Sequence, residues 1–150
     1  MDFWETTYKR RISLQTGQNH GLVRCEPDWC WDLREFKDFD LWIALDGSGE
    51  ISFNQVQYPV TAGFTVCFPP GRWDVHARHD PEKPLRVFFC HFDLKVPPGA
   101  DLPPVPEPDP ALLQPDGLLW GTVRELADCL DTGHSPVLRE NLLWQLLLRR

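Results

Sequence analysis

Residues 96–116, VPPGADLPPVPEPDPALLQPD, hold eight prolines and constrain the fold more than any other stretch of the chain. Proline removes a backbone donor and fixes φ, so neither a helix nor a central strand can run through this stretch, and it is predicted to be an extended connector. The 150 residues suffice for one domain with a sizeable core. We expect four parts: an N-terminal arm (1–18), a main domain (19–95), the connector (96–116) and a final segment (117–150).

The main domain is predicted to be all β. Short apolar runs such as LWIAL (41–45), FTVCF (64–68) and RVFFCHF (86–92) alternate with turn signals such as DGSGE and PPG. Strands at this spacing are typical of a sandwich or barrel. The dipeptide Asp46-Gly47 predicts a hairpin. The run 86–92 is predicted to pair with WDVHA (73–77) across the turn between them.

After the connector the apolar period changes to that of helices. Leu119, Val123, Leu126 and Leu130 follow one another at spacings of three and four, and Ser135-Pro136 predicts the start of a second helix. This second helix carries a wide apolar stripe. Two interpretations stay open: the stripe packs on the chain's own barrel, or it forms the seam of a homodimer. The residues assigned to the seam are Leu138, Leu142, Leu143, Leu146 and Leu147.

Composition narrows the classes of partner. The net charge of −7 argues against non-specific binding of nucleic acid, which needs clustered Lys and Arg. Five irregularly spaced cysteines fit a reducing compartment, so we expect a cytoplasmic protein. No apolar run is long enough to span a membrane, and no membrane partner is expected. Seven tryptophans leave aromatic faces for a pocket after the core is filled.

The order of these elements resembles the N-terminal domain of AraC/XylS-type transcriptional regulators. The resemblance covers roughly residues 10–150 and rests on Gly47-x-Gly49, then Gly63-x5-Pro69-Pro70-Gly71, the turn RHDPEKP and the Leu-rich final helix. It implies a cupin or jelly-roll β barrel that binds a small effector such as a sugar. It further implies a two-helix antiparallel hairpin that pairs subunits. The family's helix-turn-helix domain, through which the full-length parent would contact DNA, does not occur within these residues.

Cupin enzymes usually bind a metal, and that alternative must be weighed against the sensing domain. The resemblance places His76 after the second-motif turn, but the region of the first motif reads REFKDFD (34–40), in which Asp40 is the one plausible carboxylate. Two ligands fall short of the three that a catalytic metal site needs. Residues three apart on a strand face opposite sides, so His79 cannot join His76. We expect no metal, no cofactor and no enzymatic activity.

The predicted pocket combines aromatic walls with a few polar groups. An inward Arg34 offers a bidentate fork to oxygens, and His76 is expected to face the barrel interior. The alternative for each residue is ordinary core or surface packing. Two other outcomes stay open: a stand-alone metal-dependent isomerase or dioxygenase, and a barrel packed shut that only dimerises. The residues assigned to ligand binding are Trp31, Arg34, Trp42, His76, Phe89 and His91.

Overall fold

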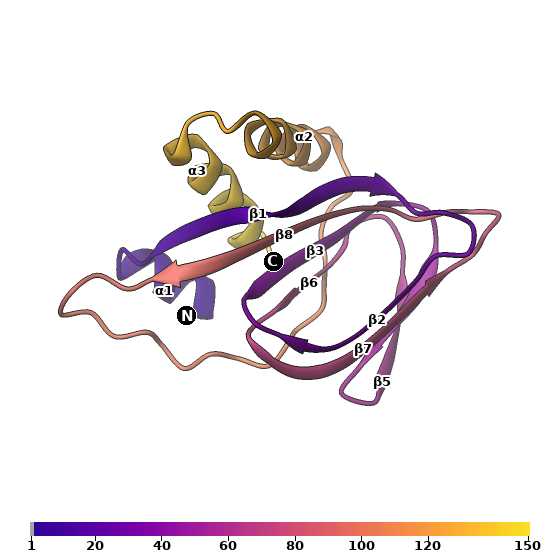
Figure 1. The fold of residues 1–150 in the computed structure, drawn as a ribbon, viewed down its shortest axis with the longest axis horizontal. Coiled ribbons are helices and arrows are strands. Elements are labelled where there is room, and N and C mark those ends of the chain that lie inside the picture. The colour runs from indigo at the N-terminus through magenta and orange to yellow at the C-terminus, as the bar shows by residue number, and fades with distance from the viewer. Residues whose placement is uncertain (1) are drawn as a thin grey trace.

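The computed structural model describes residues 2–150 and contains two antiparallel sheets that face each other (Figure 1). Met1, the first residue of the predicted arm, lies outside the described residues. The larger sheet has the order β1 (Ser13–Arg24), β8 (Arg86–Lys95), β3 (Phe39–Asp46), β6 (Phe64–Phe68) and β9 (Ala111–Leu112). The smaller sheet has the order β2 (Cys30–Phe36), β7 (Gly71–His79), β4 (Gly49–Phe53) and β5 (Val56–Val60). The predicted β sandwich or barrel followed by helices is confirmed.

Both predicted strand pairings are wrong. Strand β8 pairs with β1 and β3, whereas β7 pairs with β2 and β4, so residues 86–92 and 73–77 belong to different sheets. The segment after Asp46 likewise carries the chain from one sheet to the other, because β3 and β4 lie in different sheets. The hairpin forms instead at Asn54-Gln55, where both residues have positive φ and join β4 to β5.

Strand β3 is buried on both of its faces, which explains its nearly continuous apolar sequence. Leu41 and Ile43 belong to an apolar cluster shared with the helices, and Trp42 and Ala44 belong to a second cluster between the sheets. Strand β8 alternates in the same way. Its side chains therefore divide into two sets, one facing the helices and one facing the sandwich interior.

Two helices, α2 (Gly117–Thr132) and α3 (Pro136–Leu147), cover the outer face of the larger sheet (Figure 1). Asp116 and Ser135 cap their N-termini through backbone N–H groups three residues on. The predicted stripe on the first helix is buried in this layer. The interpretation that the second stripe packs on its own domain is the one the structure supports.

The predicted dimer seam is wrong for four of its five leucines. These four leucines are at most 3% exposed and pack with the strands of their own chain. They are Leu142, Leu143, Leu146 and Leu147. Leu138, at 37% exposed, is the one member at the surface. The physical reason is that the outer face of β3 and β8 is itself apolar and takes up the stripe.

The N-terminal arm packs against the helical layer and does not cover the space between the sheets. It forms α1 (Phe3–Lys9) and the first part of β1. Trp4 is 7% exposed and lies edge-on to Phe39 and Trp144. The arm is thus part of the helix-side core.

The proline-rich connector is extended and returns along the large sheet. Its short strand β9 pairs with β6, and the N–H of Leu113 donates to the carbonyl of Gly63. A Cβ at Gly63 would lie 2.2 Å from the Leu113 carbonyl oxygen, and its φ is +94°, so glycine permits this crossing.

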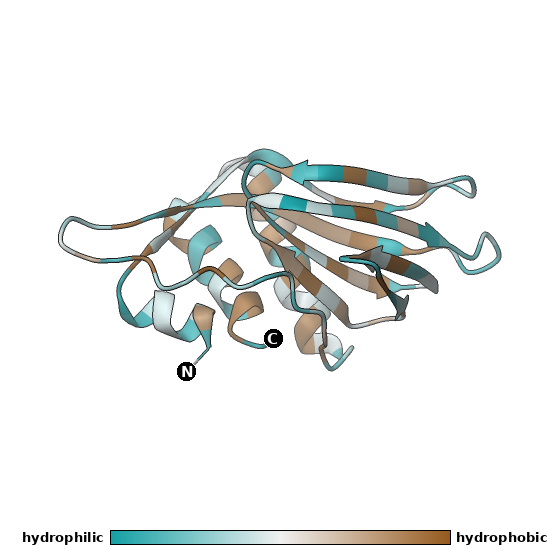
Figure 2. Cartoon of the chain, turned by 90° about the horizontal axis from the view of Figure 1, so that it is seen from below, coloured by the Kyte–Doolittle hydropathy of each residue, from teal (hydrophilic) through white to brown (hydrophobic). Residues whose placement is uncertain are grey.

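In Figure 2 the turns at the right-hand end of the sandwich are hydrophilic. Within residues 2–150, no helix is long and apolar enough to cross a membrane.

Candidate ligand-binding site

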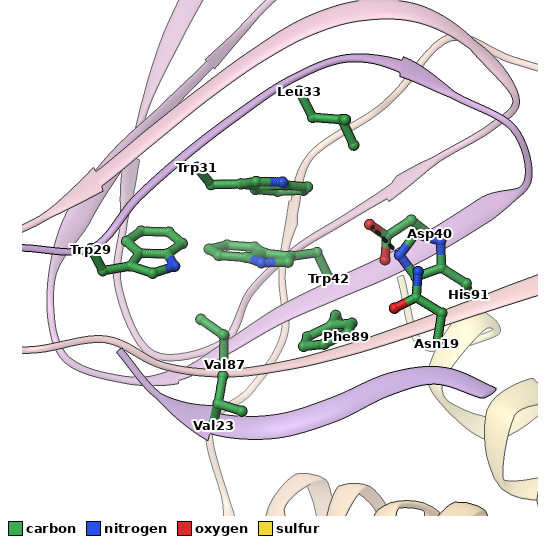
Figure 3. A pocket seen from close by; sticks show the side chains of 10 residues that line it. All are labelled: Asn19, Val23, Trp29, Trp31, Leu33, Asp40, Trp42, Val87, Phe89 and His91. Carbon is green, nitrogen blue, oxygen red and sulfur yellow. Dashed lines mark ion pairs between the residues drawn. The ribbon is translucent and has the colours of Figure 1, made fainter. Parts of the chain in front are cut away.

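A cavity of about 310 Å³ opens between the two sheets, on the interior side of β3 and β8 (Figure 3). The barrel is therefore not packed shut. Most of the lining is apolar, with a few polar groups, as is usual for small-molecule sites. The lining residues are Asn19, Val23, Trp29, Trp31, Leu33, Asp40, Trp42, Val87, Phe89 and His91.

Three tryptophans form the aromatic part of the lining. Trp31 of β2 stacks on Trp42 of β3 with ring centroids 5.9 Å apart and planes 20° from parallel, so this pair bridges the two sheets (Figure 3). Trp29 lies edge-on to His79 at 5.6 Å. His79 accepts a hydrogen bond from the N–H of Leu85 and lies 3.2 Å from the Pro27 carbonyl, which anchors the loop before β2.

Phe89 forms part of the wall next to strand β1. Gly21 is its register partner on β1, and a Cβ at that glycine would lie 2.7 Å from the Phe89 ring. The ring occupies the space that any other residue at position 21 would fill. Glycine therefore sets how far the Phe89 ring can lie toward β1.

The opposite end of the cavity is polar. Asp40 of β3 and His91 of β8 are register partners whose side chains point into the sandwich, with Asp40 Oδ2 3.3 Å from His91 Nε2. His91 Nδ1 lies 2.7 Å from Asp38 Oδ1. Figure 3 shows Asn19 beside this pair. Both ring nitrogens of His91 are therefore engaged by carboxyl groups, and the imidazole is held between them.

Asp40 is 2% exposed, and its environment opposes ionisation. Burial, and then the charge of Asp38, raise the pKa of the Asp40 carboxyl well above its usual range. Its second oxygen, Oδ1, is buried without a hydrogen-bond partner among residues 2–150. A buried carboxyl oxygen without a partner is costly, and such groups are found at functional sites.

Four of the six predicted ligand-binding residues line the cavity together: Trp31, Trp42, Phe89 and His91. The predictions that Arg34 and His76 face the interior are wrong. Arg34 has a side chain 79% exposed and lies 4.0 Å from Asp74, and His76 is 58% exposed and pairs with Asp32. On β2 and β7 these residues alternate with inward-facing Trp31 and Val75, so both point outward.

Several cavity residues were not assigned from the sequence, among them Trp29, Asn19 and Leu33. The sequence indicated Asp40 only as a possible metal ligand. Its inward direction could have been predicted, because Asp40 precedes Trp42 by two residues on one strand and therefore shares its face. Asn19 had no such signal, because it lies within the register shift of β1 between Thr16 and His20.

The donor set at the polar end does not fit a metal ion. A site of the cupin type needs at least three protein ligands, and no group of three or more suitable His, Cys, Asp or Glu side chains is present in residues 2–150. The two nitrogens of His91 are already directed at carboxyl groups. The five cysteines are free thiols.

Comparison with known proteins supports the fold and leaves the family open. No protein-family model matches this chain, and no curated protein matches it. Among solved structures, the chain is similar to ToxT from Vibrio cholerae with an unsaturated fatty acid bound, with TM-score 0.50 and 9% identity, covering 91% of this chain and 50% of ToxT. The chain thus spans about half the length of ToxT.

Two further solved structures align less well. YhaK from Escherichia coli has TM-score 0.45 and 15% identity over 76% of this chain and 56% of YhaK. A cupin protein from Bacteroides fragilis has TM-score 0.35 and 16% identity over 63% of this chain and 70% of that protein. The fold itself is a cupin-like jelly roll.

Proposed function

We propose that the chain is an effector-sensing domain of an AraC-type transcriptional regulator. The observation that carries this proposal is the cavity between the sheets, where aromatic walls meet one cluster of polar groups. A small molecule bound there controls DNA binding by a helix-turn-helix domain elsewhere in the parent protein. In this proposal the domain is a binding module, whose polar groups Asp38, Asp40 and His91 contact one another at the end of the cavity.

The likeness to ToxT supports this proposal at the level of the fold. ToxT is a regulator of the AraC family, and its structure holds an unsaturated fatty acid. The likeness extends over 91% of this chain. At 9% identity it carries no information on which molecule this chain binds.

A bulge in β1 connects the cavity to the helical layer. The register of β1 against β8 shifts between Thr16 and His20, and Asn19 of this segment lines the cavity. The next residue, His20, lies 3.5 Å from Asp131 near the end of α2. We propose that a ligand touching Asn19 shifts α2 between two positions through this bulge. The free energy of this shift is limited by the difference between the ligand's affinities for the two states.

Association of two copies remains part of the proposal, with a different surface from the predicted seam. Four seam leucines are buried in their own domain, so the exposed start of α3, with Val137 at 68% and Leu138 at 37% exposed, is the candidate contact. Light scattering in the micromolar range tests this. A dimer that becomes monomeric in Leu138→Asp agrees with it, and a monomeric wild type refutes it.

A thermal-shift screen tests the sensing function. A ligand that binds only the folded state raises the melting temperature in proportion to its concentration relative to Kd. Hits should lose their effect in Trp31→Leu, which removes part of the cavity wall. They should keep it in Trp120→Leu, a matched change on α2, where Trp120 lies under Arg86 and Arg124 outside the cavity. Equal loss in both variants would contradict binding in the cavity.

A further inference from the structure

The two ends of the cavity differ in chemistry, and this difference constrains the ligand if the cavity is the effector site proposed above. One end presents the rings of Trp29, Trp31 and Trp42. The polar groups gather at the other end, as Asn19, Asp40 and His91 (Figure 3). A molecule that fills this space needs an apolar body and a single polar head.

Carboxyl groups outnumber bases at the polar end. Asp38 and Asp40 flank His91, with one carboxyl group at each ring nitrogen. Among the described residues, no Lys or Arg lines the cavity. Arg150 lies across the sheet, beside Phe39 and Cys67 in the helix-side layer.

One acceptor at this end is still free. Asp40 Oδ1 is buried and has no partner in the described part of the chain, although Oδ2 of the same carboxyl faces His91. A carboxylate oxygen in a dry environment binds strongly to a charged donor, and a bound cation in turn favours the ionised form of Asp40. We propose that the cavity binds an amphipathic cation, with its apolar body against the tryptophans and a protonated amine donating to Asp40 Oδ1.

Other head groups fit the same space less well. A carboxylate head would meet the carboxyl groups of Asp38 and Asp40, and no Lys or Arg among the described residues lines the cavity to offset them. A sugar carries hydroxyls on all sides, and those directed at the tryptophan rings, Leu33 and Val87 would lose their hydrogen bonds to water without gaining others. A neutral alcohol can donate to Asp40 but contributes no charge.

Three probes with one body separate these classes. Phenylpropylamine, phenylpropanol and phenylpropionate share the phenylpropyl group and differ in their cationic, neutral or anionic head. Isothermal titration calorimetry of the wild-type chain near neutral pH compares their Kd values. We expect the amine to bind about 10-fold more tightly than the alcohol, as a charge-assisted hydrogen bond compares with a neutral one. The carboxylate should bind most weakly.

Substitution at the acceptor locates the effect. Asp40→Asn keeps one side-chain oxygen and the shape of the side chain, but it removes the carboxyl group and its negative charge. The preference for the amine over the alcohol should therefore fall to about 2-fold or less. Asp128→Asn, at an exposed position on α2, makes the same change outside the cavity and should keep the full preference. Circular dichroism and the melting temperature verify that both variants fold.

The outcomes separate this inference from the function on which it rests. Tightest binding of phenylpropionate, or equal binding of all three probes, overturns the cation inference and leaves a cavity that binds small molecules. An amine preference that survives in a folded Asp40→Asn overturns the assignment to Asp40. Failure of all three probes to bind, at concentrations where free amines remain soluble, counts against the cavity as a ligand site and against the inference with it.

Discussion

The two faces of strands β3 and β8 have opposite roles although they share one backbone. On the helix side, Leu41, Ile43 and Phe88 are fully buried and pack against α2 and α3. On the interior side, Asp40 and His91 remain among the aromatic rings beside an open cavity. The same alternation of residues thus produces a filled core and a partly open site.

The difference shows how a small domain can keep a cavity at little cost in stability. The helix-side cluster includes most of the long aliphatic side chains of α2 and α3, so the strands are held from outside. Void space and a buried carboxyl on the inner face are destabilising in isolation. A barrel without the helical layer would have a smaller free energy of unfolding to offset these two costs.

The sharpest test of this contrast uses neighbouring phenylalanines that point in opposite directions. Phe88 is 0% exposed on the helix side, and Phe88→Ala should cost about 3–5 kcal/mol of unfolding free energy. Phe89 is partly buried against the cavity, and Phe89→Ala should cost less than half as much while weakening ligand binding. Denaturant unfolding measures both. Equal losses would erase the contrast between the faces.

A glycine on β1 tests how closely the interior face is packed. Gly21→Ala places a methyl 2.7 Å from the Phe89 ring, which must move toward the cavity, and we expect a loss of roughly 1–3 kcal/mol with altered ligand affinity. Gly17→Ala, on the same strand with nothing within 4 Å of its Cβ, is the control and should change neither. Thermal unfolding and calorimetry measure the two effects.

The buried carboxyl gives the interior face its own pH dependence. Because the pKa of Asp40 in the folded chain lies above its unfolded value, its contribution to stability is greatest at low pH and is lost as pH rises through the folded value. Asp38 and His91 are the titratable groups that lie beside the Asp40 carboxyl. Asp40→Asn should therefore gain in melting temperature relative to wild type as pH increases from about 4 to 8.

The control for this titration is Asp128→Asn, for which the difference from wild type should stay flat across the same range. A difference for Asp40→Asn that is constant, or that falls with rising pH, would show that Asp40 is ionised at little cost.

The smallest effects are expected on the outer face of the smaller sheet. Arg34 and His76 are exposed and make surface ion pairs, which contribute little. Arg34→Ala and His76→Ala should each change stability by no more than about 0.5 kcal/mol and leave ligand affinity unchanged. A clear loss of binding in either variant would return that residue to the site.

The sequence predicted several of the strands and both C-terminal helices, but it did not predict α1, β1 or β2, and it failed at the pairings. The runs 41–45, 64–68 and 86–92 are strands, and Ser135 caps the second C-terminal helix as predicted. Which sheet a strand joins was not readable, because a chain that crosses between sheets at a tight turn has the same turn residues as a hairpin. Gly47, with φ +88° beside the Pro84 carbonyl, makes such a crossing.

The error over the leucine stripe has a different cause. The stripe at residues 138–147 is apolar whether it meets a second copy or its own sheet. The continuous apolar run 41–45 was the missed signal, since a strand that is apolar at every position needs cover on both faces. Within residues 2–150, the helices after the connector supply that cover.

The site residues were predicted correctly where the alternation of side chains along a strand could be assigned to the inward or outward face. Trp42, Phe89 and His91 lie on strands whose inward face could be inferred, whereas β2 has a register shift between Leu33 and Glu35 that hid the outward direction of Arg34. The Asp38–His91–Asp40 cluster depends on pairing between two distant strands. No spacing along the chain indicates such a contact.

Filling the cavity tests the central claim most directly. Leu33→Trp adds a large ring to the wall of the space between the sheets, and Leu112→Trp adds the same ring at a position that is 70% exposed. Calorimetry with the phenylpropyl probe that binds the wild type most tightly compares the three chains. The cavity account predicts that a folded Leu33→Trp loses binding by 10-fold or more, on the order expected for steric exclusion, while Leu112→Trp retains it. Wild-type affinity in a folded Leu33→Trp would contradict the account.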